Sequence, residues 1–371
     1  MLPFTRPTIS QEEIDAVVEV LRSGWLATGP KVQRFEKELA DYIGGGVEVR
    51  AFNSGTSALE AALLASDIGP GDEVIVPALS FVASANVVLR VGAKPVFVDV
   101  DLSSRNLDVE KVKGAMSEKT RGIIPVHFSG LPVDMEPIYK LSQENRITVI
   151  EDACHAIGSS YNGAMIGAAG NPACFSFHPN KNMTTIEGGA LSCKDVAFMK
   201  RIERIRFHGI ERNEQGEIFV SEWGGKMNLS DVSAAMGIVQ LGKLDDFNRQ
   251  RERLAHRYFE QLPDHPALVK PANGKGHSWH MFCVCIDGEA IGKSRQEIID
   301  FFREHDIAVG MHYPAMHLFP LYRRLGYQAG DFPNAEQIGA QTLTLPLFPG
   351  MTDRDVDMVC ETINSLLSSG K

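Results

Sequence analysis

Short apolar runs alternate with helix-like segments between residues 47 and 150, and this alternation constrains the fold more than any other feature of the sequence. The expected strands are residues 47–52, 73–77, 95–100, 121–126 and 147–150. The expected helices are residues 57–65 and 83–91, with a turn and a helix within 131–145. Strands that are joined through helices usually run parallel, because a parallel crossover needs a dozen or more residues. The sequence therefore predicts an α/β protein with a mostly parallel sheet wrapped by helices.

Two helices are expected before the first strand. Ser10 followed by Glu13 is a capping-box pattern, which predicts a helix that ends near Ser23 and Gly24. A second amphipathic helix is expected at residues 31–43.

The loop after the first predicted strand has the composition of a phosphate site. In sheets of this kind, ligands bind outside the carboxyl ends of the strands. Residues 53–58 read Asn-Ser-Gly-Thr-Ser-Ala and lead directly into a helix. Gly55 lets the backbone approach a ligand, Thr56 and Ser57 offer hydroxyls, and the helix start offers free N–H groups. An ordinary helix cap is the alternative. The loop has neither a Walker nor a GxGxxG pattern, which argues against ATP and NAD.

Two further strand ends carry candidate site residues. Phe81 follows the second strand, where an aromatic side chain either packs in the core or stacks on a planar ring. Asp152 follows the buried run at 147–150, and a carboxylate there needs a partner. That partner is either a protonated heterocycle nitrogen or the start of the next helix, and this segment leaves both readings open. His155 lies one turn further on.

Lys181 lies in a polar stretch after His178 and Pro179, which favour an extended or turning backbone. Residues 173–180 contain no acidic side chain that would make a local ion pair with it. A lysine among uncharged neighbours can lose its proton and attack a carbonyl as an amine. An ordinary solvated loop lysine is the alternative.

Together, these features indicate one binding site. A phosphate loop, an aromatic residue, a carboxylate and an isolated lysine fall at successive strand ends. Pyridoxal 5'-phosphate (PLP) requires this set: an anchor for its phosphate, a stacking partner, a carboxylate for its ring nitrogen and a Schiff-base lysine.

The sequence also resembles a known family, the nucleotide-sugar aminotransferases of the DegT/StrS-like group within the fold-type-I PLP enzymes. The ordered motifs that carry the resemblance lie at residues 23–30, 53–58, 71–75, 125–127, 151–156, 176–182, 187–189, 208–209, 227–231 and 345–349. The resemblance implies the three-layer fold-type-I architecture. It places a large PLP-binding domain at residues 1–250 and a smaller C-terminal α/β domain at 251–371.

The resemblance also implies roles for individual residues. Lys181 is expected to hold the cofactor, Asp152 to pair with its pyridine nitrogen, Phe81 to stack on its ring and His155 to lie near that ring. The residues expected to hold the phosphate are Gly55, Thr56 and Ser176. Relatives that replace the lysine with histidine dehydrate their sugar, so Lys181 favours transamination.

Asn228 resembles a residue that reaches the cofactor phosphate of the neighbouring subunit, which implies a homodimer with shared active sites. Capping the helix predicted at 231–241 is the alternative role for Asn228, although Ser230 is better placed for it.

The expected activity is amination of a nucleotide-linked keto-sugar, with glutamate as amino donor, 2-oxoglutarate as product and the pyridoxamine form of the cofactor between the two halves of the cycle. The opening residues Leu2, Pro3 and Phe4, together with the region 177–182, favour a UDP-4-keto-sugar as substrate. Such an enzyme belongs to amino-sugar biosynthesis for lipopolysaccharide or another polysaccharide. The alternatives are a 3-keto-sugar aminotransferase, an enzyme for a keto-sugar without a nucleotide, and a regulatory protein that binds PLP without turnover.

The remaining third of the chain is expected to be a smaller α/β unit. A long helical tract is predicted after Asn228. Residues 262–276 are rich in Pro, Gly and Asn and are predicted to lead into the smaller unit. This unit is expected to contain strands at 281–286 and 307–311 and helices at 294–305 and 353–367. His312, Tyr313 and His317 are candidates for substrate contacts by resemblance. A surface loop is the alternative for His312, and the two histidines lack a nearby carboxylate that would complete a metal site. Candidates for a diphosphate contact are Arg6, Arg206 and Lys226.

Composition argues against several other classes of protein. A formal net charge of −10, with no basic stripe, argues against nucleic-acid binding. The N-terminus lacks the apolar centre of a signal peptide, and Pro77, Ser80, Ser84 and Asn86 interrupt the longest apolar-looking stretch. The six cysteines show no CxxC spacing. We therefore expect a reduced, cytoplasmic protein with no membrane span and no structural zinc.

Overall fold

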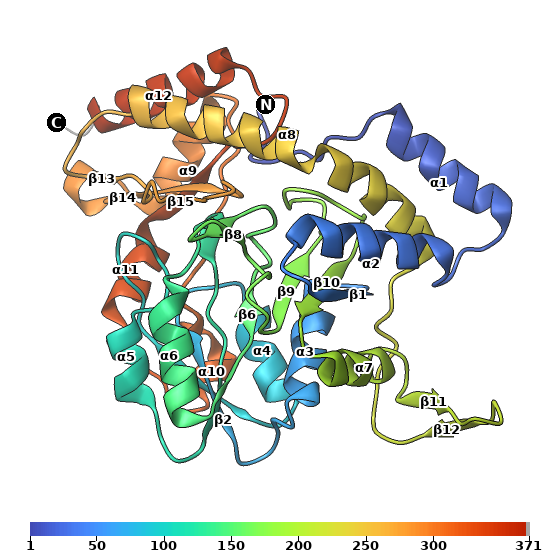
Figure 1. The fold of residues 1–371 in the computed structure, drawn as a ribbon. Helices are drawn as coiled ribbons and strands as arrows, with labels where there is room; N and C mark the ends of the chain where they lie inside the picture. The colour runs from blue at the N-terminus through green and yellow to red at the C-terminus, as the bar shows by residue number, and fades with distance from the viewer. Residues whose placement is uncertain (369–371) are drawn as a thin grey trace.

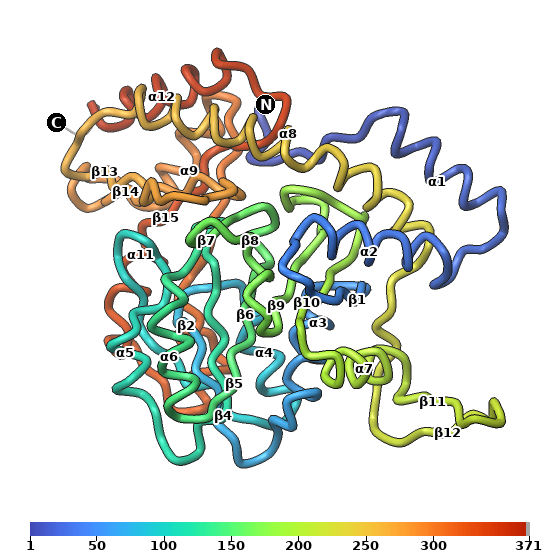
Figure 2. Tube along the Cα trace, viewed as in Figure 1, coloured from blue at the N-terminus to red at the C-terminus, as the bar shows by residue number. Residues whose placement is uncertain are grey.

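A computed structural model describes residues 1–368 of the chain, and Figure 1 shows its fold. Two short sheets join into one central sheet. The first has the order β3-β2-β4-β5 and consists of β3 (Lys94–Val98), β2 (Glu73–Pro77), β4 (Thr120–Ile123) and β5 (Thr148–Val149). The second has the order β1-β10-β9-β6 and consists of β1 (Glu48–Phe52), β10 (Gly189–Cys193), β9 (Ala173–Ser176) and β6 (Glu151–Asp152). Because β6 follows β5 after one residue and a bridge joins Val126 to Asp152, the strands form one row, which Figure 2 shows as a tube trace.

The central sheet is mostly parallel, as the sequence predicts. The β3-β2-β4-β5 strands pair in parallel, and so do β6 and β9. The exception is β10, which runs antiparallel to both β9 and β1. β10 was not predicted, because its sequence, Gly-Ala-Leu-Ser-Cys, has neither a branched apolar run nor a clean alternation.

Helices cover both faces of this sheet. The first face carries α3 (Gly55–Ala65), α4 (Ala83–Arg90) and α7 (Val196–Ile205), and the second carries α2 (Pro30–Ile43), α5 (Val109–Ala115), α6 (Met135–Asn145) and the first half of α8 (Asp231–Gln261). Side chains alternate between the two cores: in β2, Val74 and Val76 pack into the first and Ile75 into the second. This confirms the predicted three-layer α/β fold.

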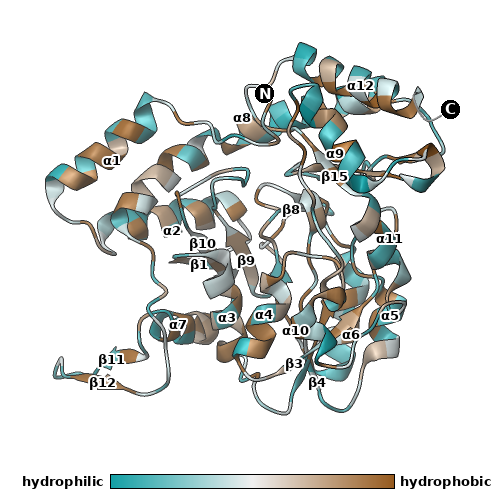
Figure 3. Cartoon of the chain, turned by 180° about the vertical axis from the view of Figure 1, so that it is seen from behind, coloured by the Kyte–Doolittle hydropathy of each residue, from teal (hydrophilic) through white to brown (hydrophobic). Residues whose placement is uncertain are grey.

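The helix α1 (Gln11–Ser23) packs against α8 at the edge of the molecule. It begins with the predicted capping box between Ser10 and Glu13 and ends at Gly24 in the left-handed conformation. In Figure 3, brown and teal residues alternate along α1, and Ile14 and Leu21 leave apolar surface exposed.

A second, antiparallel sheet lies beside the C-terminal helices. It has the order β13-β14-β15 and consists of β13 (Leu268–Val269), β14 (Phe282–Ile286) and β15 (Thr342–Leu345). It shares a core with α9 (Arg295–Glu304), α12 (Asp353–Ser368) and the second half of α8. The strand predicted at 307–311 was wrong: the structure has only isolated bridges there, one of them between Gly310 and Thr344.

The helix α8 crosses the predicted domain boundary at residue 250 without a break. Its apolar residues up to Leu244 pack with the large core, and those from Leu254 onward pack with the second sheet. The first residues of the chain also lie with the C-terminal unit, because Leu2 pairs with Ile307. The division of the chain at residue 250 stays a prediction.

The other elements are short. They are β7 (Ser160–Tyr161), β8 (Ala164–Met165), β11 (Ile210–Arg212), β12 (Ile218–Val220), α10 (Pro320–Arg323) and α11 (Pro333–Gln341), with 3-10 turns at Phe128–Gly130, Glu289–Ile291 and Met316–Leu318. The β11–β12 hairpin projects from the body of the molecule (Figure 1). Within residues 1–368, no helix is both long and apolar enough to cross a membrane.

Candidate active site

A cavity of about 340 Å³ lies at the carboxyl ends of the central strands. Most of the residues singled out from the sequence line it: Gly55, Thr56, Phe81, Asp152, His155, Ser176, Lys181, His312 and Tyr313. They come from loops that follow four different strands and from the loop after residue 310. The parallel topology therefore brings together side chains that are up to 258 positions apart in the sequence (313 minus 55).

The start of α3 forms the polar end of this cavity. Ser54 caps the helix by accepting a hydrogen bond from the Ser57 N–H at 3.1 Å, which leaves the N–H groups of the first turn directed at the cavity. Gly55 is required by packing, because a Cβ there would come within 2.8 Å of Cys154 Sγ and 3.0 Å of Ser176 Cβ. Gly189 makes a similar close approach, since its Cβ would meet Gly55 N at 2.4 Å. This helix start suits a bound phosphate.

The Asp152 carboxylate is buried and held from two sides. Ser84 Oγ donates to Oδ2 at 2.6 Å, and the Cys154 N–H donates to Oδ1 at 3.1 Å. Both contacts fix the direction of the carboxylate. The Asp152 carboxylate can therefore pair with a cationic nitrogen in the cavity.

Lys181 lines the same cavity, in the turn after Pro179. No hydrogen bond or ion pair of its ammonium group is found within the described part of the chain. Burial lowers the pKa of Lys181 below its ordinary value, and the neighbouring Cys154 and Asp152 partly oppose this shift. The amine is thus poised to lose its proton, as a Schiff-base lysine must.

Aromatic rings also line the cavity. Phe81 is 53% exposed although it lines the cavity, and its ring centroid lies 5.9 Å from that of Tyr313. Tyr313 in turn stacks on His155, with centroids 6.2 Å apart and planes 16° apart. An exposed aromatic face at the mouth of a cavity offers a stacking surface for a planar ring.

His155 is a buried lining side chain with an unused polar atom. Its Nδ1 is buried and has no hydrogen-bond partner within residues 1–368. Burial lowers the pKa of His155 well below its ordinary value, and Lys181 and His312 add to this shift. The ring is therefore neutral, and a polar group in the cavity would satisfy its nitrogen.

His317 does not reach the cavity, and its assignment as a substrate contact was wrong. The side chain is fully buried beneath α11, where Nε2 lies 2.9 Å from Glu336 Oε1 and the ring packs edge-on against Phe332. Arg206 is likewise unavailable for a diphosphate, because it is buried and pairs with Glu36 at 2.5 Å.

The remaining predicted contacts lie outside this cavity. Asn228 contacts Thr28, and its Oδ1 accepts a hydrogen bond from Lys226 Nζ at 2.6 Å. Its predicted role concerns a neighbouring subunit and stays a prediction. Arg6 and Lys226 are exposed.

Sequence reasoning missed several residues of the site. Ser84 holds Asp152 from the first turn of α4. Five further residues line the cavity: Ser54, Ser80, Cys154, Glu187 and Gly188. The Ser80 and Ser84 hydroxyls lie 3.0 Å apart, Ser80 in the loop before α4 and Ser84 at the start of that helix. Among residues 1–368, no three His, Cys, Asp or Glu side chains are grouped to hold a metal ion.

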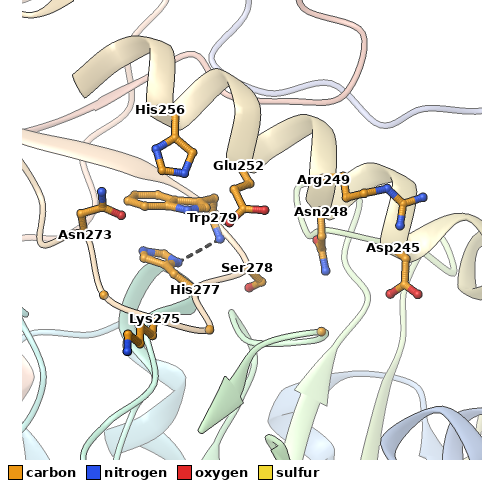
Figure 4. A pocket seen from close by; sticks show the side chains of 13 residues that line it. Asp245, Asn248, Arg249, Glu252, His256, Asn273, Lys275, His277, Ser278 and Trp279 are labelled. Atoms are coloured by element: carbon orange, nitrogen blue, oxygen red, sulfur yellow. Dashed lines mark hydrogen bonds between the residues drawn. The ribbon is translucent and has the colours of Figure 1, made fainter. Parts of the chain in front are cut away.

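A second, larger cavity of about 440 Å³ lies between α8 and the segment 273–279. Figure 4 shows its lining, with the indole of Trp279 between His256 and His277. The His277 ring stacks on Trp279 with centroids 3.8 Å apart. None of the predicted site residues lines this cavity, so the chemistry belongs to the first one.

The residues of the first cavity suit PLP. They supply an N-terminal helix turn for the phosphate, a fixed carboxylate for the ring nitrogen, an exposed aromatic face and a lysine with a lowered pKa. The unpartnered Nδ1 of His155 adds a place for a polar substituent of the ring.

Comparisons with known proteins agree with this chemistry. Residues 7–364 match the DegT/DnrJ/EryC1/StrS aminotransferase family. The spore coat polysaccharide biosynthesis protein SpsC of Bacillus subtilis (strain 168) is 40% identical over 379 aligned residues, which cover 99% of this chain and 97% of SpsC.

The solved structures that share this fold include those of two bacterial aminotransferases. Spr1654 of Streptococcus pneumoniae, assigned as a sugar aminotransferase and solved in its PMP form, is 30% identical with a TM-score of 0.94 and full coverage of both chains, 100% and 100%. PseC of Helicobacter pylori, an aminotransferase in the biosynthesis of pseudoaminic acid, is 27% identical with a TM-score of 0.92, over 99% of each chain. The chain therefore belongs to the DegT/DnrJ/EryC1/StrS aminotransferase family and is a PLP-dependent aminotransferase.

Proposed function

We propose that this aminotransferase converts a nucleotide-linked keto-sugar, most simply a UDP-4-keto-sugar, to the amino-sugar with glutamate as the donor. The sugar class is supported by the names of the relatives above, which concern polysaccharide and pseudoaminic acid biosynthesis. The observation that carries the proposal is that a lysine with a lowered pKa, a held carboxylate and a helix start line one cavity.

When bound, PLP supplies an electron-accepting ring that is linked to the reacting amine. The first turn of α3 binds its phosphate, and Asp152 keeps its ring nitrogen protonated. Lys181 Nζ provides the neutral amine that holds the cofactor. Once released by a donor amine, Nζ would move the proton from the donor's α-carbon to the cofactor. In the second half of the cycle, the same nitrogen would move a proton from the cofactor to the sugar carbon that receives the amino group, so that no proton is gained or lost by Lys181.

His312 and Tyr313 are the proposed substrate contacts at the entrance. Burial, reinforced by Lys181, lowers the pKa of His312 to about 4, so its ring is neutral at physiological pH. Its Nδ1 lies 2.7 Å from Thr344 Oγ1, which fixes the ring. A neutral imidazole and a phenol can hydrogen-bond sugar hydroxyls without attracting other anions.

The first experiment tests the lysine and the half-reaction together. The purified protein with PLP should absorb at roughly 400–430 nm, and this band should be lost on adding glutamate. In a separate sample without an amino donor, borohydride reduction should fix the cofactor on Lys181, and Lys181→Ala should abolish turnover. If the spectrum stays unchanged with every amino donor, the protein is instead a regulatory protein that binds PLP.

A second experiment identifies the sugar. The holoenzyme is incubated with glutamate and a panel of UDP- and dTDP-linked 4-keto and 3-keto sugars, and products are read by mass. Amination of a UDP-4-keto-sugar supports the proposal. Amination restricted to 3-keto-sugars, or to keto-sugars without a nucleotide, contradicts it in favour of the corresponding alternative.

The proposal includes a homodimer in which Asn228 of one subunit contacts the cofactor phosphate in the other. Exposed apolar side chains lie on α1, on the turn after it and on the β11–β12 hairpin: Ile14, Leu21, Trp25, Leu26, Ile218, Phe219, Val220 and Trp223. A second copy that covers these residues would remove them from water.

Complementation tests the shared site directly. Lys181→Ala and Asn228→Ala are each expected to be inactive or strongly impaired, and mixing them under subunit exchange should restore activity. A mixed dimer has one site with both residues intact only if Asn228 acts across the interface. No recovery, with exchange shown by mass, would mean that Asn228 serves its own subunit.

The proposed location is the cytoplasm. The six cysteines are all unpaired, which suits a reducing compartment. Fractionation of the source cells, with the protein detected by antibody, tests this location.

A further inference from the structure

Asn182 and His280 lie directly behind the active-site cavity, and the mechanism above uses neither of them. Each side chain is buried, with 4% of its surface exposed. Asn182 follows Lys181 in the chain, and His280 precedes β14. The His280 ring centroid lies 4.7 Å from that of His155, with the planes 30° apart. The His155 ring thus contacts both His280 and Tyr313.

The direction of each hydrogen bond around Asn182 is fixed by main-chain carbonyls. Asn248, which projects from α8 in Figure 4, donates from Nδ2 to the carbonyl of Ile157 at 3.3 Å. Its Oδ1 is therefore the atom that faces Asn182 and accepts from Asn182 Nδ2 at 2.7 Å. Asn182 Nδ2 donates its second hydrogen to the carbonyl of Ser278 at 2.8 Å. Because a carbonyl can only accept, the orientation of the Asn182 amide is set.

This orientation determines the tautomer of His280. The Asn182 atom that faces His280 Nδ1, 3.2 Å away, is Oδ1, which can only accept. In a neutral imidazole, Nδ1 must then carry the proton and Nε2 must be bare. The His280 Nε2 atom is buried and has no partner within the described residues. This fits a bare nitrogen, because a protonated Nε2 would leave a buried N–H group without an acceptor.

The groups around His280 keep its ring neutral. Those that face it are Lys181, His155, Arg251 and His312, and none of them is a carboxylate. Burial is the largest cause of a pKa well below the ordinary value, and all four groups add to the shift. A positive charge close to the Lys181 amine is thereby avoided.

We propose that Asn182 and His280 are positioning residues for the reaction at Lys181. Asn182 holds His280 as the neutral tautomer protonated on Nδ1, and the His280 ring fixes the plane of His155 at the back of the cavity. The link to the reaction rests on the proposed function, whereas the tautomer does not.

Nuclear magnetic resonance of the apoprotein tests the tautomer without any turnover. The protein is labelled with ¹⁵N-histidine, and the His280 signals are identified by their loss in His280→Asn. We expect one protonated nitrogen, at Nδ1, and one bare nitrogen, at Nε2, unchanged between about pH 5 and 8. A ring protonated on Nε2, or one that titrates in this range, would overturn the proposal.

Asn182→Asp provides a perturbation with a defined direction. A carboxylate facing His280 Nδ1 favours the charged ring, so the pKa of His280 should rise and both its nitrogens should become protonated at a higher pH than in the wild-type protein. If the His280 signals of this variant match those of the wild-type protein, residue 182 does not control the ring.

A matched pair of variants tests the positioning role. His280→Asn places an amide near the position of Nδ1 and keeps a donor for Asn182, whereas His280→Gln places its amide near Nε2. We expect the rate of the glutamate half-reaction to fall by about 10- to 100-fold in His280→Gln, and by a smaller factor in His280→Asn, which keeps the hydrogen bond to Asn182 but lacks the ring that packs against His155. Thermal unfolding checks that both variants fold.

Equal rates for these two folded variants would remove the positioning role. If the wild-type protein does not react with any amino donor, the proposed function and the positioning role both fail. The resonance experiment still decides the tautomer of His280 in that case.

Discussion

Glu13→Gln should destabilise the protein far more than its position on an edge helix suggests. The Glu13 carboxylate is fully buried between α1 and α8. It accepts hydrogen bonds from the Ser10 N–H at 2.8 Å and Ser10 Oγ at 2.6 Å, from Gln240 Nε2 at 2.8 Å, and from Lys243 Nζ at 3.0 Å. An amide at this position would direct its own N–H groups at these donors.

The pKa of Glu13 gives the size of the effect. Burial alone would raise this pKa, but the hydrogen bonds from Ser10, Gln240 and Lys243 outweigh burial and lower it from 4.5 to about 2. A shift of about 2.5 units, at 1.36 kcal/mol per unit, corresponds to about 3 kcal/mol in favour of the folded state. Since the folded-state pKa is the lower one, this contribution is present above pH 4.5 and is lost as the pH falls toward 2.

Urea unfolding at fixed protein concentration measures this contribution. With a slope of at least about 3 kcal/mol/M for a chain of this size, Glu13→Gln should lower the midpoint by up to about 1 M at neutral pH. By about pH 3, the difference from wild type should have fallen to less than half.

Glu12→Gln is the matched control on the same lysine. Glu12 pairs with Lys243 at 2.6 Å but is 70% exposed, so its loss should cost about 1 kcal/mol or less. Equal losses for the two variants would refute the argument, as would a Glu13→Gln penalty that does not depend on pH.

Two further variants test the active site. Gly55→Ala would bring a Cβ within 2.8 Å of Cys154 Sγ, so we expect a loss of about 1–3 kcal/mol in stability and weaker PLP binding. Thermal unfolding measures the stability, and titration of the apoprotein measures the binding. Unchanged affinity would contradict the close packing of α3. Asp152→Asn keeps the shape of the side chain but not its charge, so the rate of the glutamate half-reaction should fall by about 10²-fold or more, as measured by stopped-flow absorbance. A wild-type rate would mean that Asp152 does not keep the ring nitrogen protonated.

Much of the site could be predicted because it obeys a rule of topology. Gly55, Asp152 and Lys181 were all selected as residues that follow strands, and parallel strands end at one edge of a sheet. The helix start at Gly55 and the buried strand before Asp152 are local patterns, so the sequence carries them without knowledge of distant contacts.

Other features depend on distant contacts and left no local pattern. His312 and His317 lie five positions apart in one loop, yet one enters the cavity and the other is buried against Glu336 from α11. Likewise, α8 stays continuous for 31 residues although its two halves pack in different cores. No proline interrupts α8, and the change of core partner leaves no trace in its helical pattern.

The distribution of charge in the cavity explains why so many of its polar groups are neutral. Lys181 must be free of its proton to act as a nucleophile, and burial favours that state. His155, His280 and His312 all have lowered pKa values, with burial as the first cause and Lys181 as a contributor. Were one of these rings charged, it would repel a cationic ring nitrogen that Asp152 is placed to hold. Because the rings are neutral, the Asp152 carboxylate can set the position of the cationic nitrogen, and the first-turn N–H groups of α3 can set that of the anionic phosphate. The histidines can then shape the cavity without competing for either charge.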